Sequence, residues 1–159
     1  MFYIGDKIFY PMHGVGIIED IEKKTFFDDE DEKEYYIVRI VCKNMNVNVP
    51  VATCEDVGIR PISDKSTVLR VIEFLAEPST PMSANWNKRY RENTDKLKTG
   101  SIFDVAEVVR NLIRQDREKK LSTGEKRVLD NAKKVLASEI MSVNGITQEQ
   151  ALKIIDESV

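Results

Sequence analysis

Hydrophobic and polar residues alternate in short runs through residues 1–62. Alternation with a period of two, interrupted by Pro, Gly and Asn, is typical of strands that bury one face. The expected strands are Lys7–Tyr10, Val15–Lys24, Tyr35–Val41, Met45–Val49 and a short run around Gly58–Ile62. Five short antiparallel strands in about 60 residues predict a small Tudor- or SH3-like β-barrel.

The apolar period changes from 2 to 3.6 near Ser63–Asp64, and this indicates that helices follow the strands. Each expected helix has a side chain that can cap its N-terminus. The candidate caps are Asp64, Ser83, Ser101, Ser122 and Thr147, and helix ends are expected at Thr99–Gly100 and Asn144–Gly145. The sequence therefore predicts an α+β protein, with a barrel domain over residues 1–62 and an all-helical domain of about five helices over residues 64–159.

Five consecutive acidic residues, Asp28–Glu32, separate the second and third expected strands. Like charges repel, so this run is expected to form a solvated hairpin tip; a calcium loop would need spaced ligands and a glycine turn. A small barrel of this kind keeps strand edges, and an edge can take up a partner's strand by β-augmentation.

Composition indicates a soluble globular protein, because 42% of the 159 residues are hydrophobic and 32% are charged. No apolar run approaches the roughly 18 residues that span a bilayer, and the N-terminus lacks the features of a signal peptide. The two cysteines, Cys42 and Cys54, suit reduced thiols. We therefore expect a cytoplasmic protein with no membrane association.

The net charge of −3 conceals a basic segment. Residues 86–134 hold 14 Lys or Arg and 8 Asp or Glu, a net charge of +6, whereas residues 1–60 hold 7 and 12. Local rather than total charge governs binding to nucleic acid, so the basic segment is the part of the chain suited to DNA or RNA.

The tryptophan segment Asn85–Arg91 opens the basic region. Trp86 is the only tryptophan, and Lys88, Arg89 and Arg91 follow it within five positions. On a helix, Lys88 and Arg91 share a face, and Arg89 lies one turn after Trp86. A bulky aromatic beside phosphate-binding cations is the combination that wedges into a nucleic-acid groove while gripping the backbone.

Two other interpretations of the aromatic residues remain open. A lone tryptophan is often a core or domain-interface anchor, and Trp86 could then hold the two domains of a protein-only adaptor together. The strand aromatics could instead form a cage for a methylated ligand, although such residues usually pack in a core. The cage residues would be Tyr3, Phe9, Tyr10, Tyr35 and Tyr36.

The sequence does not indicate an enzyme. The single histidine, His13, has no second histidine to join it, and a zinc site with Cys42 and Cys54 would need three separate elements to converge. Gly14 and Gly16 lack the spacing of a phosphate-binding loop. No pair of carboxylates stands out as acid and base, so we expect neither a cofactor nor a metal.

Several short motifs are spread along the chain from Gly5 to about Ile140. They are Gly5–Gly16, Val49–Pro50, Val57–Arg60, Asn85–Tyr90, Lys96–Gly100, Val105–Leu112 and Leu121–Arg127. Together these motifs resemble the CarD/CdnL family of bacterial transcription regulators. The first motif is also found in the polymerase-binding module of transcription-repair coupling factors, and its combination with the tryptophan segment is specific to this family.

The resemblance implies that the N-terminal Tudor-like domain binds the β subunit of RNA polymerase through an exposed strand. Carried onto this chain, the strand is Asn46, Val47, Asn48 and Val49, with Lys24 nearby. Family members often have arginine at the positions of Lys24 and Asn48. Lys24 keeps the charge without the bidentate geometry, and Asn48 lacks the charge.

The resemblance also implies that the helical domain contacts promoter DNA at the upstream edge of the transcription bubble. The family's tryptophan, here Trp86, would wedge into the minor groove there, and Lys88, Arg89 and Arg91 would contact backbone phosphates. Binding would be nearly independent of sequence, and the protein is expected to act as a monomer that stabilises the open promoter complex.

Overall fold

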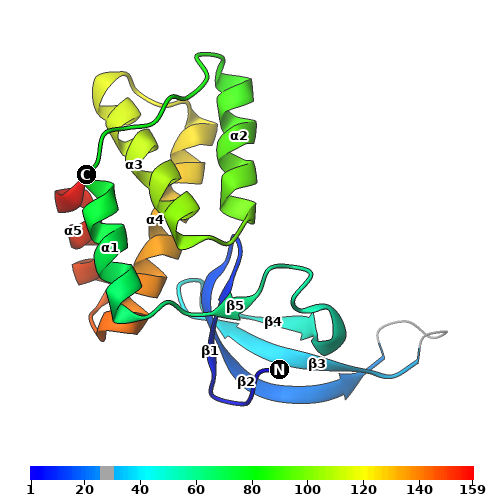
Figure 1. Ribbon diagram of the computed structural model, residues 1–159. Coiled ribbons are helices and arrows are strands. Elements are labelled where there is room, and N and C mark those ends of the chain that lie inside the picture. Colours follow the sequence, from blue (N-terminus) through cyan, green and yellow to red (C-terminus); the bar gives the residue numbers. More distant parts are fainter. Residues whose placement is uncertain (26–30) are drawn as a thin grey trace.

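The computed structural model describes residues 1–25 and 31–159. Its first part is one antiparallel sheet of five strands in the order β4-β3-β2-β1-β5 (Figure 1). The strands are β1 Lys7–Tyr10, β2 Gly14–Lys24, β3 Lys33–Ile40, β4 Met45–Pro50 and β5 Arg60–Pro61, with a short 3-10 helix, η1, at Val51–Thr53. The sheet is not closed into a barrel: β4 and β5 lie at its opposite edges.

Five helices follow the sheet. They are α1 Lys65–Leu75, α2 Trp86–Lys98, α3 Ile102–Glu118, α4 Thr123–Asn144 and α5 Gln148–Ser158. The predicted α+β class, with strands preceding helices, is confirmed. Most of the acidic run predicted to form a hairpin tip lies outside the described residues. Among the described helices, none has both the length and the apolar character needed to cross a membrane.

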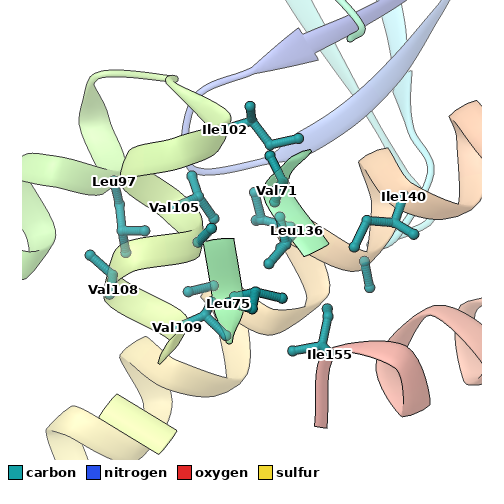
Figure 2. Packing of buried hydrophobic residues seen from close by; sticks show 14 of the residues in the cluster. Val71, Leu75, Leu97, Ile102, Val105, Val108, Val109, Leu136, Ile140 and Ile155 are labelled. Carbon is teal, nitrogen blue, oxygen red and sulfur yellow. The ribbon is translucent and has the colours of Figure 1, made fainter. Parts of the chain in front are cut away.

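The helices enclose one apolar core to which all five contribute (Figure 2). Its fully buried members include Leu75, Leu112 and Ile155. A second, smaller core lies within the sheet and is built around Ile8, Ile18 and other inward-facing strand residues. These apolar side chains supply the main driving force for folding, because each buried Leu or Ile contributes roughly 1.5–3 kcal/mol.

The predicted helix caps are confirmed for four of the five helices: the side chains of Asp64, Ser101, Ser122 and Thr147 each accept a backbone hydrogen bond. For α2 the prediction of Ser83 was wrong. Asn85 is the cap, because the helix begins at Trp86 and the Asn85 carboxamide oxygen reaches the amides of both Asn87 and Lys88 (3.0 and 3.2 Å).

The turn between β1 and β2 joins the sheet to α4. The backbone amide of Val15 donates to Ser138 Oγ at 3.0 Å, and both groups are buried. Gly14 has φ +90°, and a Cβ there would lie 2.7 Å from Ser138 Oγ. Only glycine combines this conformation with so close an approach. The Gly5–Gly16 motif therefore contains the residues that seat the sheet on the helices.

A buried ion pair lies beside this turn. Glu139 of α4 is fully buried and accepts hydrogen bonds from Arg60 Nη1 and Nη2 (2.7 and 2.9 Å) and from the Ser63 amide (2.8 Å). The Arg60 guanidinium also lies 4.3 Å from the centre of the Phe9 ring. Phe9 belongs to the apolar core of the helices. The sheet is therefore joined to the helices by apolar packing as well as by the ion pair.

Candidate nucleic-acid and partner interfaces

The loop between α1 and α2 is held in place by α3. Arg114 donates to the carbonyls of Leu75 and Glu77 at 3.2 and 2.7 Å. Asn111 and Thr80 exchange two hydrogen bonds, of 2.8 and 3.3 Å. The last carbonyls of a helix lack partners within it, so a cation from α3 satisfies the end of α1 and directs the chain toward α2.

Trp86 is the first residue of α2, and it is 54% exposed. In Figure 1, α2 begins at the end of the helical bundle that is far from the sheet and runs toward it. Tyr90, one turn later, is 40% exposed, whereas Leu97 on the same side of α2 is buried. The adaptor interpretation requires Trp86 to join the sheet to the helices. At this end of α2 it does not do so.

The three cations of the tryptophan segment have different surroundings. Lys88 is exposed and forms a loose pair with Glu92 at 3.9 Å. Arg91 is exposed, and it has no ion-pair partner among the described residues. Arg89 points inward: its side chain is 13% exposed and it donates to both carboxylate oxygens of Glu125, each at 2.7 Å.

Arg89 is committed to contacts within the protein. Its Nη1 also donates to the Ser83 carbonyl at 3.1 Å. The hydrogen bonds to Glu125 raise the pKa of the Arg89 guanidinium above its ordinary value. Glu125 itself is 2% exposed. The structure therefore leaves Lys88 and Arg91 exposed on α2, whereas the Arg89 guanidinium is buried against Glu125.

A groove of about 920 Å³ begins beside Trp86 and runs between the α1–α2 loop and the α3–α4 connection. Its lining includes Lys119 and Lys120, which are exposed and have no ion pair among the residues described. These two lysines were not among the predicted site residues. The only signal for them was the net charge of the whole basic segment, because their place beside Trp86 depends on how α3 packs against α2.

The strand predicted to bind a partner is an edge of the sheet. β4 pairs with β3 on one side, and no strand in the described part of the chain pairs with its other side. Asn46 and Asn48 are exposed, whereas Val47 is half-buried and Val49 is buried. This alternation means that the asparagines face away from the core of the sheet while the valines pack into it.

Lys24 lies apart from that strand. It ends β2, two strands from β4, and forms an ion pair with Glu22 at 3.2 Å. Its register partner is Lys33, two positions beyond the point where β4 stops pairing with β3. Lys24 is therefore near the C-terminal end of β4 but is not part of its edge.

His13 and Cys42 meet at the turn that seats the sheet, where Cys42 Sγ donates to the His13 carbonyl at 3.3 Å. Burial, aided by the charge of Lys43, lowers the pKa of His13, and burial raises the pKa of the Cys42 thiol. No group of three or more His, Cys, Asp or Glu side chains is arranged to hold a metal ion within the described residues.

Comparison with known proteins identifies relatives of both halves of the chain. Residues 2–63 match the family model for the CarD-like/TRCF RID domain, and residues 70–156 match that for the CarD C-terminal domain. The chain is also similar to YdeB of Bacillus subtilis (strain 168), which is named as a candidate transcription factor. The two are 43% identical over 150 residues, which cover 94% of this chain and 97% of YdeB.

Proposed function

The chain belongs to the CarD/CdnL family of bacterial transcription regulators, and we propose that it stabilises the open promoter complex with Trp86. In this proposal β4 binds the β subunit of RNA polymerase. The helices then present Trp86 to the minor groove at the upstream edge of the bubble.

The observation that carries the proposal is the exposed indole at the start of α2. An apolar side chain that is 54% exposed, at a helix N-terminus held by the Asn85 cap, is suited to enter a base step that is already partly unstacked. Intact duplex offers it less room. Trp86 therefore favours the junction between duplex and melted DNA.

Phosphate contacts would come from exposed cations of α2 and of the groove that Trp86 lines. Lys88 and Arg91 were predicted, and Lys119 and Lys120 join them because they line the groove beside Trp86. These contacts would position the protein on DNA without reading its sequence. The guanidinium of Arg89 is already engaged by Glu125 and Ser83, so Arg89 is not one of them.

The proposed polymerase contact is β-augmentation on the outer edge of β4. The unpaired edge supplies main-chain donors and acceptors, and the asparagine side chains at Asn46 and Asn48 face solvent. Since Asn48 is uncharged, binding would depend on main-chain pairing more than on an ion pair at that position. Lys24 would add a charge near the end of the strand.

Tethering and wedging would act together. Attachment of the sheet to polymerase holds the helices near the promoter at high effective concentration. A ligand shifts an equilibrium only by its difference in affinity for the two states. Stacking worth about 1–3 kcal/mol per base corresponds to a roughly 5- to 150-fold gain in open complex.

The test is the lifetime of the open complex on an unstable promoter, with polymerase from the same cell. Trp86→Ala should abolish most of the lengthening that the wild-type protein causes. Leu69→Ala is the matched control, because Leu69 is also an exposed apolar side chain (59% exposed) but lies on α1 and does not line the groove. An unchanged lifetime with Trp86→Ala would reject the wedge.

A further inference from the structure

We propose that Arg89 and Glu125 form a clamp that positions Trp86, so that Arg89 acts on DNA through the tryptophan and not by touching phosphate. This inference rests on the function proposed above. It assigns a positioning role to the buried acid Glu125, and the same role to Arg89, which the sequence alone places on the DNA.

The clamp joins three elements at one point. Arg89 lies one turn after Trp86 on α2, and its two hydrogen bonds of 2.7 Å end on Glu125 in the first turn of α4. A third, of 3.1 Å, ends on the Ser83 carbonyl in the loop before α2. The Ser122 hydroxyl, which caps α4, also donates to Glu125 at 3.3 Å.

Such a pair fixes orientation as well as distance. A bidentate arginine–carboxylate contact holds the planar guanidinium in a single geometry. The side chains are 13% and 2% exposed, so solvent screens the attraction little. The first four backbone N–H groups of a helix have no partner within the helix. In α2, the Asn85 cap binds two of these groups, and the clamp fixes Arg89 at the end of the same turn.

Positioning has a direct consequence for binding. A side chain that is ordered before it meets its ligand loses less freedom on association. If the clamp were opened, the first turn of α2 would fray, and the entropy lost in ordering Trp86 would then weaken the DNA complex. The clamp therefore sets how much of the wedge's stacking energy is available to hold the bubble open.

Two substitutions separate positioning from a phosphate contact. Arg89→Lys keeps the positive charge but cannot form the bidentate pair, so a phosphate contact would survive it and a clamp would not. Glu125→Gln removes a negative charge from beneath a cationic surface. Electrostatics alone would then tighten DNA binding, whereas loss of the clamp would weaken the wedge.

The experiment measures open-complex lifetime with the full chain and its polymerase. Both Arg89→Lys and Glu125→Gln should shorten the protein-dependent lifetime about two- to tenfold, the cost of ordering a side chain that is no longer held beforehand. Neither should shorten it further when combined with Trp86→Ala. The slope of log affinity for DNA against log salt should stay the same in both variants, because the clamp makes no phosphate contact. Loss of one phosphate contact would reduce the magnitude of that slope by about 0.9.

Fluorescence anisotropy of Trp86 supplies a second readout that does not need polymerase. Trp86 is the only tryptophan, so its local motion is observed directly, and both clamp variants should lower the anisotropy. Glu139→Gln is the matched control: it alters a buried, arginine-bound carboxylate near the other end of α4 and should leave the anisotropy unchanged. If the single variants unfold, Arg89→Met with Glu125→Leu removes the pair without stranding a charge.

The outcomes are distinct. The clamp proposal would be overturned if the open-complex lifetime with Arg89→Lys equalled that with the wild-type protein, or if it were longer with Glu125→Gln. Arg89 would then be assigned to the phosphate contacts. If Trp86→Ala itself has no effect, the proposed function fails, and the anisotropy alone then decides the clamp. Lowered anisotropy in Glu125→Gln would support it, and unchanged anisotropy would overturn it.

Discussion

The ion pair between Arg60 and Glu139 predicts an asymmetric loss of stability. Glu139 is fully buried and accepts three hydrogen bonds, two of them from Arg60, whereas the Arg60 side chain is 27% exposed. Removing Arg60 strands a carboxylate that has no access to water. Removing the charge of Glu139 leaves a partly exposed guanidinium that still donates to the carbonyls of Gly100 and Pro61 (2.9 and 3.1 Å), so the first change should cost more than the second.

The magnitudes follow from the contacts. Arg60→Ala leaves only the Ser63 amide on the Glu139 carboxylate and also removes the contact with Phe9. Breaking a buried pair in this way costs about 3–5 kcal/mol. Glu139→Gln keeps the shape and weakens charge-assisted hydrogen bonds, for about 1–3 kcal/mol. Against a typical total of about 5–15 kcal/mol, both losses are measurable.

Urea unfolding of the full chain, followed by far-ultraviolet circular dichroism, measures both losses. The apolar double variant, Arg60→Met with Glu139→Leu, should recover much of the stability lost in Arg60→Ala, because no charge is then stranded. The reasoning is refuted if Glu139→Gln costs as much as Arg60→Ala, or if the apolar double variant is the least stable of the three.

Three further predictions concern separate surfaces. Val47→Asp on the edge strand should abolish binding to a polymerase β fragment in a pull-down while leaving the helical circular dichroism signal unchanged; normal binding would mean that a different strand docks. Replacing Lys119 and Lys120 together by Ala should lower the slope of log affinity for DNA against log salt by about 2, and an unchanged slope would remove the groove from the DNA contacts. The pKa of His13, measured by NMR, should lie below its ordinary value of 6.5. The unfolded chain then binds the proton more readily than the folded chain, so the free energy of unfolding should fall as the pH drops below 6.5. A measured His13 pKa at or above 6.5 would contradict the burial argument.

Periodicity and capping signals predicted most of the secondary structure because local signals are strong in this chain. Four helix N-termini were found from capping side chains that bind their own first turn, and such contacts are local in sequence. The α2 cap was missed because both Ser83 and Asn85 are good caps, and only the position of the first helical residue decides between them. Closure of the sheet was not predictable, since it depends on whether two distant edges pair.

The surroundings of Arg89 show why the contacts of a side chain are harder to predict than the element that carries it. Lys88, Arg89 and Arg91 are neighbouring cations in sequence, and nothing local separates a phosphate contact from a buried ion pair. The difference arises from Glu125, which lies 36 positions away. Lys119 and Lys120 illustrate the converse, because their place beside Trp86 exists only after α3 and the α1–α2 loop have packed together.

The start of α2 and the sheet that contains β4 lie at opposite ends of the molecule (Figure 1), and α4 contacts both parts. Its N-terminal turn carries Glu125, which holds the first turn of α2, and its later turns carry Ser138 and Glu139, which hold the sheet. A tether raises effective concentration most when its geometry matches the span between its two sites. Loosening either end of α4 should therefore reduce open-complex stabilisation by different routes. Loss of Glu125 would make Trp86 more mobile relative to the other helices. Loss of Glu139 would leave Trp86 ordered but would loosen the position of the helices relative to the sheet that binds polymerase.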